Sequence, residues 1–166
     1  MRIDVSDIIK INDATLNVEY KGVLEDFTSI CDGYLFDKPV SFNGVVTNTG
    51  GVLKLDGHLK VSFTTKCYRC LNDVEGELEL EIKEDFLPPQ ANDDDEFYTY
   101  EGNNIDIDKV LKDNIILNLP MKQVCDDNCK GLCRTCGTNL NISQCDCKHE
   151  ADVDPRMEAL KNFFNN

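Results

Sequence analysis

Residues 53–83 read LKLDGHLKVSFTTKCYRCLNDVEGELELEIK, and they contain two runs in which apolar and polar side chains alternate. The first run extends from Leu53 to Phe63 and the second from Val74 to Ile82. A period of two residues is typical of a strand with one buried and one solvated face. The sequence therefore predicts a long antiparallel hairpin, with Cys67-Tyr-Arg-Cys70 at its tip.

Further elements are expected on both sides of this hairpin. Residues 16–20 and 40–46 show weaker alternation, and the glycine-containing turn at 48–51 joins the second of these runs to the hairpin. Apolar residues recur at helical spacing over residues 107–115, where Asp106 can cap the first turn and Pro120 prevents continuation. These signals predict strands before the hairpin and a core helix after it.

The expected fold class is α+β. It consists of a mainly antiparallel sheet that could close into a barrel-like form, a core helix, a C-terminal Cys-rich zinc module and a short terminal helix. Asp154-Pro155 ahead of an apolar stripe indicates that last helix. We expect two domains: residues 1–120 form the α+β core with the Cys67/Cys70 hairpin tip, and residues 121–166 form the zinc module and the helix, packed on the core.

Eight of the nine cysteines have metal-ligand spacing: Cys67-x2-Cys70 and Cys125-x3-Cys129-x3-Cys133-x2-Cys136-x8-Cys145-x-Cys147. Thiolates are soft ligands, and four of them suit the tetrahedral preference of zinc. The segment 125–147 has few large apolar side chains, so burial could hardly stabilise it, whereas metal binding could. We expect two structural zinc ions.

The favoured division joins Cys67 and Cys70 to Cys125 and Cys129, and leaves the last four cysteines as a local second site. A second division pairs Cys67 and Cys70 with Cys133 and Cys136, as in an ordinary zinc ribbon, and the sequence leaves it open. His149 is an alternative ligand for one terminal position, although a solvated tail histidine is the simpler interpretation. Cys31 is spare, with a buried inert thiol as the default.

No basic and apolar leader opens the chain, and no segment approaches the roughly 18 apolar residues of a membrane span. We therefore expect a cytoplasmic protein without membrane contact. Reducing compartments disfavour structural disulfides, and an odd cysteine count would leave one thiol unpaired, so metal binding is favoured over disulfides.

The chain is strongly acidic, with 17 Lys and Arg against 31 Asp and Glu, a net charge of −14. Nonspecific affinity for nucleic acid comes from basic side chains, so a basic partner protein is electrostatically easier than bare RNA. Four residues near the cysteines are candidates for rRNA contact: Lys130, Arg134, Lys148 and Arg156. Because acidic residues alternate with them, ordinary solvated charge is the competing interpretation.

An enzyme is not expected. A catalytic zinc keeps an open coordination position, whereas sulfur can occupy all four positions at each site here. The sequence contains no P-loop, nucleophile elbow or dinucleotide fingerprint, and neither of its two histidines adjoins an obvious nucleophile. Iron bound by four cysteines would instead make a rubredoxin-like electron carrier, and visible colour would reveal it.

The combined pattern resembles the YceD (DUF177) family of large ribosomal RNA subunit accumulation proteins. The similarity covers essentially the whole chain, with one departure at Arg134, where proline is frequent in the family. It is carried by Cys67-x2-Cys70, Leu117-x-Leu119-Pro120, Cys129-Lys-Gly-Leu-Cys133-Arg-Thr-Cys136-Gly-Thr-Asn-Leu140-Asn141, Cys145-x-Cys147 and Asp154-Pro155-Arg156.

This resemblance implies a process, accumulation of large-subunit (23S) rRNA and ribosome assembly, and not a direct RNA contact. The leading hypothesis is a non-enzymatic zinc protein whose acidic sheet contacts a basic ribosomal or assembly protein on large-subunit precursors. The alternative is a zinc- or redox-responsive regulator whose Cys-rich module unfolds when metal is lost.

Overall fold

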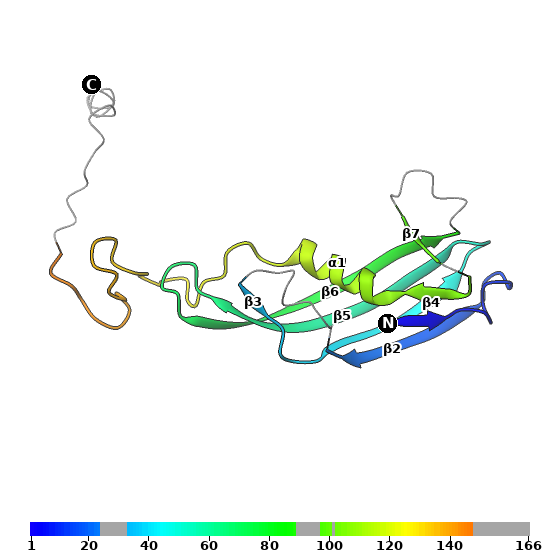
Figure 1. Cartoon of the computed structure of the whole chain (residues 1–166), viewed down its shortest axis with the longest axis horizontal. Coiled ribbons are helices and arrows are strands. Elements are labelled where there is room, and N and C mark those ends of the chain that lie inside the picture. Colours follow the sequence, from blue (N-terminus) through cyan, green and yellow to red (C-terminus); the bar gives the residue numbers. More distant parts are fainter. Residues whose placement is uncertain (24–32, 89–96, 101, 148–166) are drawn as a thin grey trace, which may run out of the picture.

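The computed structural model of the chain describes residues 1–23, 33–88, 97–100 and 102–147. Figure 1 shows a long curved sheet with a single labelled helix along one face. The elements, in chain order, are β1 (Arg2–Asp4), β2 (Thr15–Gly22), β3 (Tyr34–Leu35), β4 (Val40–Asn48), β5 (Leu53–Lys66), β6 (Asp73–Leu87), β7 (Tyr98–Thr99), β8 (Asn104–Asp106) and α1 (Ile107–Asn118).

The predicted hairpin is confirmed as the antiparallel pair β5 and β6. Its register is continuous from Leu53↔Phe86 at the open end to Lys66↔Asp73 next to the turn. Every second residue of β5 from Leu53 to Thr65 is buried, except the half-buried Gly57, whereas the residues between them are exposed or half-buried. The hairpin is long because the period-two pattern holds on both strands without a break that would end the pairing.

The sheet has the strand order β2-β4-β5-β6-β7, and β3 pairs with β5 beyond the end of β4. All pairings are antiparallel except that of β6 with the short strand β7. The α+β class and the mainly antiparallel sheet are therefore confirmed. Among the described strands the sheet does not close, since β2 and β7 form its two edges, and the barrel-like form is absent.

Helix α1 begins and ends where the sequence predicted. The Asp106 side chain caps it by accepting from the Asp108 N–H, and the Leu119 N–H bonds back to the Ile115 carbonyl at the other end. Four apolar residues of one helix face are buried against the sheet: Ile107, Val110, Leu111 and Ile115. They join the buried strand side chains in one hydrophobic core.

The sequence did not predict the pairing of β1 with β8. Arg2, Ile3 and Asp4 pair antiparallel with Asp106, Ile105 and Asn104, about a hundred residues later in the chain. The N-terminal amine also lies 3.5 Å from carboxylate oxygens of Asp106 and Asp108, at the start of α1. This small second sheet fastens the first residues beside the helix N-terminus.

After α1 the chain runs along the molecule to the tip of the β5–β6 hairpin, and the Cys-rich segment lies beyond that tip (Figure 1). The Tyr34 hydroxyl, on β3, donates to the Pro120 carbonyl and fixes the start of this connection. Near the tip, the Tyr68 N–H donates to the Gln123 carbonyl at 2.8 Å. The predicted terminal helix lies outside the described residues, and the domain boundary at residue 120 stays a prediction.

Candidate metal centres

The described cysteines form two groups of four, which we call the first and second cysteine groups. The first contains Cys67, Cys70, Cys125 and Cys129, and the second contains Cys133, Cys136, Cys145 and Cys147. Within each group the four sulfur atoms lie within 4.8 Å of one another. This is the division that the sequence favoured, and it differs from the zinc-ribbon division that the spacing also allowed.

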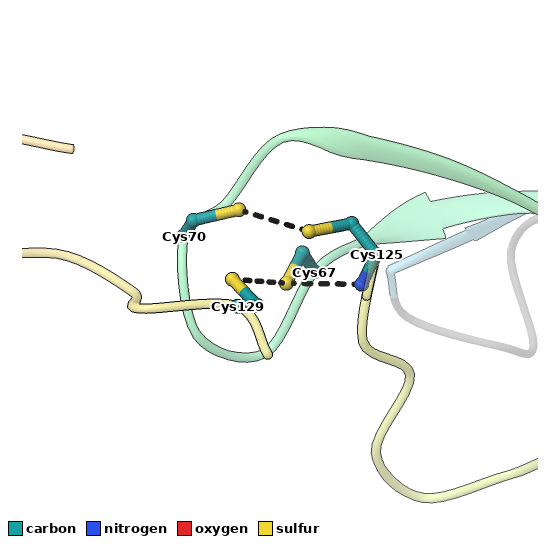
Figure 2. A group of neighbouring side chains, drawn as sticks. All are labelled: Cys67, Cys70, Cys125 and Cys129. Atoms are coloured by element: carbon teal, nitrogen blue, oxygen red, sulfur yellow. Dashed lines mark hydrogen bonds between the residues drawn. The ribbon is translucent and has the colours of Figure 1, made fainter. Parts of the chain in front are cut away.

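Figure 2 shows the four sulfurs of the first cysteine group pointing toward one another. The Sγ atoms of Cys67 and Cys129 are 3.9 Å apart, and those of Cys70 and Cys125 are 3.6 Å apart. Zinc–sulfur bonds of ~2.3 Å in a tetrahedron place sulfurs ~3.8 Å apart, whereas a disulfide needs ~2.05 Å. The geometry therefore fits one metal ion held by four thiolates.

The hairpin turn, residues 67–72, is a tight knuckle around Cys67. The Cys67 N–H donates to the Asn72 carbonyl at 2.7 Å, and the Leu71 N–H donates to the Cys67 carbonyl at 2.9 Å. This curvature directs the Arg69 N–H at the Cys67 sulfur, 3.4 Å away. Leu71 closes the turn with φ +60°, a left-handed conformation that is costly for a branched side chain.

Residues 133–138 repeat the same backbone. The Cys133 N–H donates to the Thr138 carbonyl at 2.8 Å, the Gly137 N–H donates to the Cys133 carbonyl at 2.9 Å, and the Thr135 N–H lies 3.4 Å from the Cys133 sulfur. Gly137 takes the position of Leu71, with φ +74° and no steric cost. Two equivalent Cys-x2-Cys knuckles thus each present two sulfurs to one centre.

The two groups differ in exposure. In the first cysteine group Cys67, Cys70 and Cys129 are buried and Cys125 is exposed, whereas in the second only Cys133 is buried. The Arg69 side chain donates to the carbonyls of Asp127 and Cys129, at 2.9 and 3.0 Å, and so ties the hairpin tip to the segment that carries Cys129. Solvent and chelators therefore reach the second group more easily.

Hydrogen bonds lower the pKa of some thiols in the first cysteine group and raise the pKa of others. Burial raises the pKa of Cys67, but N–H groups of Cys70, Cys125 and Arg69 outweigh it and lower that pKa to about 6. Hydrogen bonds to the sulfurs of Cys129 and Cys70 raise the pKa of Cys125 to about 12, because they stabilise the protonated thiol. Without a cation, the group keeps protons on part of its sulfurs.

The second cysteine group shows the same division. The Thr138 side chain, whose Oγ1 lies 3.2 Å from the Cys136 sulfur, lowers the pKa of Cys136 to about 6, with help from backbone N–H groups. The Cys136 sulfur and burial raise the pKa of Cys147 to about 12. A divalent cation would compensate this crowded negative charge, which is the chemistry that a four-cysteine zinc site supplies.

Metal binding is therefore expected to release protons, and to weaken as the pH falls. In each group two thiols have a pKa raised above its ordinary value and must lose their protons to become ligands, so at pH 8 we expect at least two protons to be released per metal ion. Below pH 5 Cys67 and Cys136, each with a pKa of about 6, also begin protonated, so the number of protons released per metal ion rises. Calorimetry in buffers of different ionisation enthalpy measures the number of protons released per metal ion. A number that does not change with pH would contradict the expectation.

The candidate rRNA contacts divide between described and undescribed parts of the chain. Lys130 and Arg134 are both exposed and lie on either side of the short link between the two cysteine groups. Lys148, Arg156, the alternative ligand His149 and the spare Cys31 lie outside the described residues.

Two contacts at the site were not predicted from the sequence. The Lys122 ammonium lies 4.7 Å from the centroid of the Tyr68 ring at the hairpin tip. Asn141 donates its side-chain amide to the sulfur of Cys129, at 3.3 Å. The only sequence signal for Asn141 is its position between two cysteine pairs. The spacing of residues along the chain does not indicate which sulfur its side chain contacts.

None of the helices in the described residues has the length and apolar character needed to cross a membrane.

Comparison with known proteins identifies the family. The sequence model of YceD, described as large ribosomal RNA subunit accumulation protein YceD, matches residues 55–164, which include all eight cysteines of the two groups. The search of solved structures found no match.

Three curated relatives come from plants and bacteria. The chain is 31% identical to the maize chloroplastic protein named large ribosomal RNA subunit accumulation protein YCED homolog 1, over 66% of this chain and 49% of the relative. It is 30% identical to the uncharacterized protein Rv2926c of Mycobacterium tuberculosis, over 81% of this chain and 65% of the relative.

The third relative is the uncharacterized protein YlbN of Bacillus subtilis, 31% identical over 76% of this chain and 74% of the relative. The chain thus spans about half to two thirds of the length of the first relatives. With two four-cysteine groups inside the matched region, the chain belongs to the YceD family of large ribosomal RNA subunit accumulation proteins.

Proposed function

We propose that this chain is a non-enzymatic, cytoplasmic zinc-binding protein that supports accumulation of large-subunit rRNA and ribosome assembly by contacting a ribosomal or assembly protein on large-subunit precursors. The observation that carries the proposal is the pair of four-sulfur groups in a chain of the YceD family. The name of the maize relative, a large ribosomal RNA subunit accumulation protein, supports the same process.

Both zinc ions would have a structural role. Four sulfurs at each centre leave no open position at which a substrate or water could bind the metal. The first ion would join the hairpin tip to the chain after α1, since its ligands come from positions 67–70 and 125–129. The second would close the segment 133–147, in which large apolar side chains are scarce.

The outer face of β5 and β6 supports a basic partner. It carries four lysines and seven acidic residues, a net charge of −3. Lys60 makes ion pairs with Glu77 and Glu79, both at 2.9 Å, but such exposed pairs are weak and readily exchanged. Acidic side chains in excess on a sheet face that is exposed among the described residues suit a lysine- and arginine-rich protein better than RNA phosphates.

Complementation tests the proposal. Cells that lack the chain are supplied with wild type, Cys67→Ser, Cys133→Ser or the charge-reversed variant Glu75→Lys/Glu81→Lys, and the ratio of large- to small-subunit rRNA is measured. We expect wild type alone to restore the ratio fully and to sediment with large-subunit precursors. Restoration by both cysteine variants would exclude a role for the metal centres, and normal sedimentation of the charge-reversed variant would exclude the acidic face.

One observation favours a second candidate, a zinc- or redox-responsive regulator. Each cysteine group has one exposed member, Cys125 or Cys136, that an oxidant could reach. Oxidation of such a thiolate would eject the metal and unfold the segment that depends on it. Reversible zinc release by mild peroxide, without copurifying ribosomal precursors, would select this function over the first.

A further inference from the structure

We propose that Asn141 couples the two metal centres, so that metal in the second cysteine group strengthens metal binding by the first. The proposal rests on the proposed function to the extent that both groups must bind metal. It assigns to Asn141 the role of a positioning residue, which acts on the first centre through the sulfur of Cys129.

Asn141 belongs by sequence to the second cysteine group but contacts the first. It lies between the ligands Cys136 and Cys145, yet its amide nitrogen is 3.3 Å from the sulfur of Cys129. Its side-chain oxygen accepts the Lys130 N–H at 2.8 Å. Both ends of one side chain are thus bonded to adjacent residues at the edge of the first centre.

The loop that carries Asn141 is held against the first knuckle by further contacts. The Leu140 N–H donates to the Gly131 carbonyl at 2.9 Å, and Leu132 forms a β-bridge with Asn139. The Asn139 side chain accepts the Asn141 amide at 2.9 Å and lies 3.3 Å from the Asn72 side-chain oxygen on the hairpin tip.

Gly131 makes the close approach of the two segments possible. It has φ +75°, and a Cβ at this position would lie 2.9 Å from the Arg69 carbonyl oxygen. That oxygen accepts the Leu132 N–H at 3.0 Å. The link between the two groups is therefore packed directly on the first knuckle.

An N–H donated to a metal-bound thiolate stabilises its negative charge and orients it, and loss of such a partner typically weakens metal binding 10–100-fold. The position of Asn141 depends on the second centre, because ligands of that centre stand on both sides of the loop. When the second centre is empty, no metal closes the loop and the contacts of Asn139 and Leu140 remain to hold it, so the bond to Cys129 is formed for a smaller fraction of the time. By linkage, metal in the first centre must strengthen the second by the same factor.

The experiment is a chelator titration of the full chain loaded with cadmium, followed by cadmium NMR, in which each centre gives its own resonance. Cys67→Ser and Cys133→Ser assign the two resonances. With the second centre loaded, Asn141→Ala is expected to raise the dissociation constant of the first centre by about 10-fold. By linkage, it should raise that of the second centre by the same factor when the first centre is loaded. Asn141→Asp, which keeps the acceptor for the Lys130 N–H and loses the donor, should shift the first centre in the same direction.

Asn128→Ala is the matched control, because Asn128 is an exposed asparagine next to Cys129 and the described part of the chain gives its side chain no hydrogen bond. It should leave both centres unchanged. In the Cys133→Ser background, Asn141→Ala should weaken the first centre much less than it does in the wild-type background, since the bond is already weakened there.

An unchanged dissociation constant of the first centre in Asn141→Ala with the second centre loaded, or a full additional effect in the Cys133→Ser background, would overturn the coupling while leaving two metal centres in place. Wild type that binds no cadmium and no zinc would overturn the coupling and the proposed metal centres together. The two failures are therefore distinguishable.

Discussion

Cys129→Ser is expected to lower the zinc content from two ions per chain to one and to detach the segment after α1 from the hairpin tip. A structural zinc ion supplies on the order of 10–16 kcal/mol of folding free energy in small domains. Apart from the cysteines themselves, the described residues contribute only Val74 and Val124, both half-buried, to the apolar cluster at the first cysteine group. That small cluster cannot replace the metal.

The sheet is expected to stay folded in the same variant, because its hydrophobic core is a separate cluster that contains no cysteine of either group. Elemental analysis gives the metal count, and hydrogen exchange read by peptide shows which segments lose protection. Cys31→Ser, which removes the one cysteine outside both groups, should keep two ions. Two ions in Cys129→Ser, or unchanged protection over residues 121–132, would contradict the expectation.

Phe42→Ala is expected to destabilise the sheet domain by about 3–5 kcal/mol, the usual cost of emptying a buried phenylalanine site. Phe42 is fully buried, and it pairs with Leu59 across β4 and β5. Its ring lies where a side chain of either Gly44 or Gly57 would be: a Cβ on Gly57 would come within 2.6 Å of the ring. The Phe42 ring therefore occupies the space that the absent side chains of Gly44 and Gly57 leave free.

Denaturant unfolding followed by far-UV circular dichroism measures this effect with metal saturating, so that the zinc centres contribute equally to both proteins. Leu117→Ala is the control: Leu117 lies on α1 with 81% of its surface exposed, and its loss should change the free energy of unfolding by less than about 0.5 kcal/mol. A cost below about 1 kcal/mol for Phe42→Ala would show that the core does not depend on this ring.

The local features of this protein could be predicted from its sequence. The alternation over residues 53–83 predicted β5 and β6, and Asp106 and Pro120 marked the limits of α1, because strand period, helix period and capping each depend on neighbours only a few residues apart. The cysteine spacing likewise predicted which eight cysteines gather into two groups of four, since two sulfurs separated by two residues can reach one ion through local backbone geometry alone.

The tertiary structure alone decided which distant segments meet. β1 pairs with β8, β7 lies parallel to β6, and the sheet stays open among the described strands. Both divisions of the cysteines satisfied the local spacing, and the side-by-side placement of the hairpin tip and the chain after α1 selected one of them. The hydrogen bond from Asn141 to the Cys129 sulfur likewise depends on which segments the fold places side by side. Such contacts depend on how whole elements pack, and no period of two or 3.6 residues carries that information.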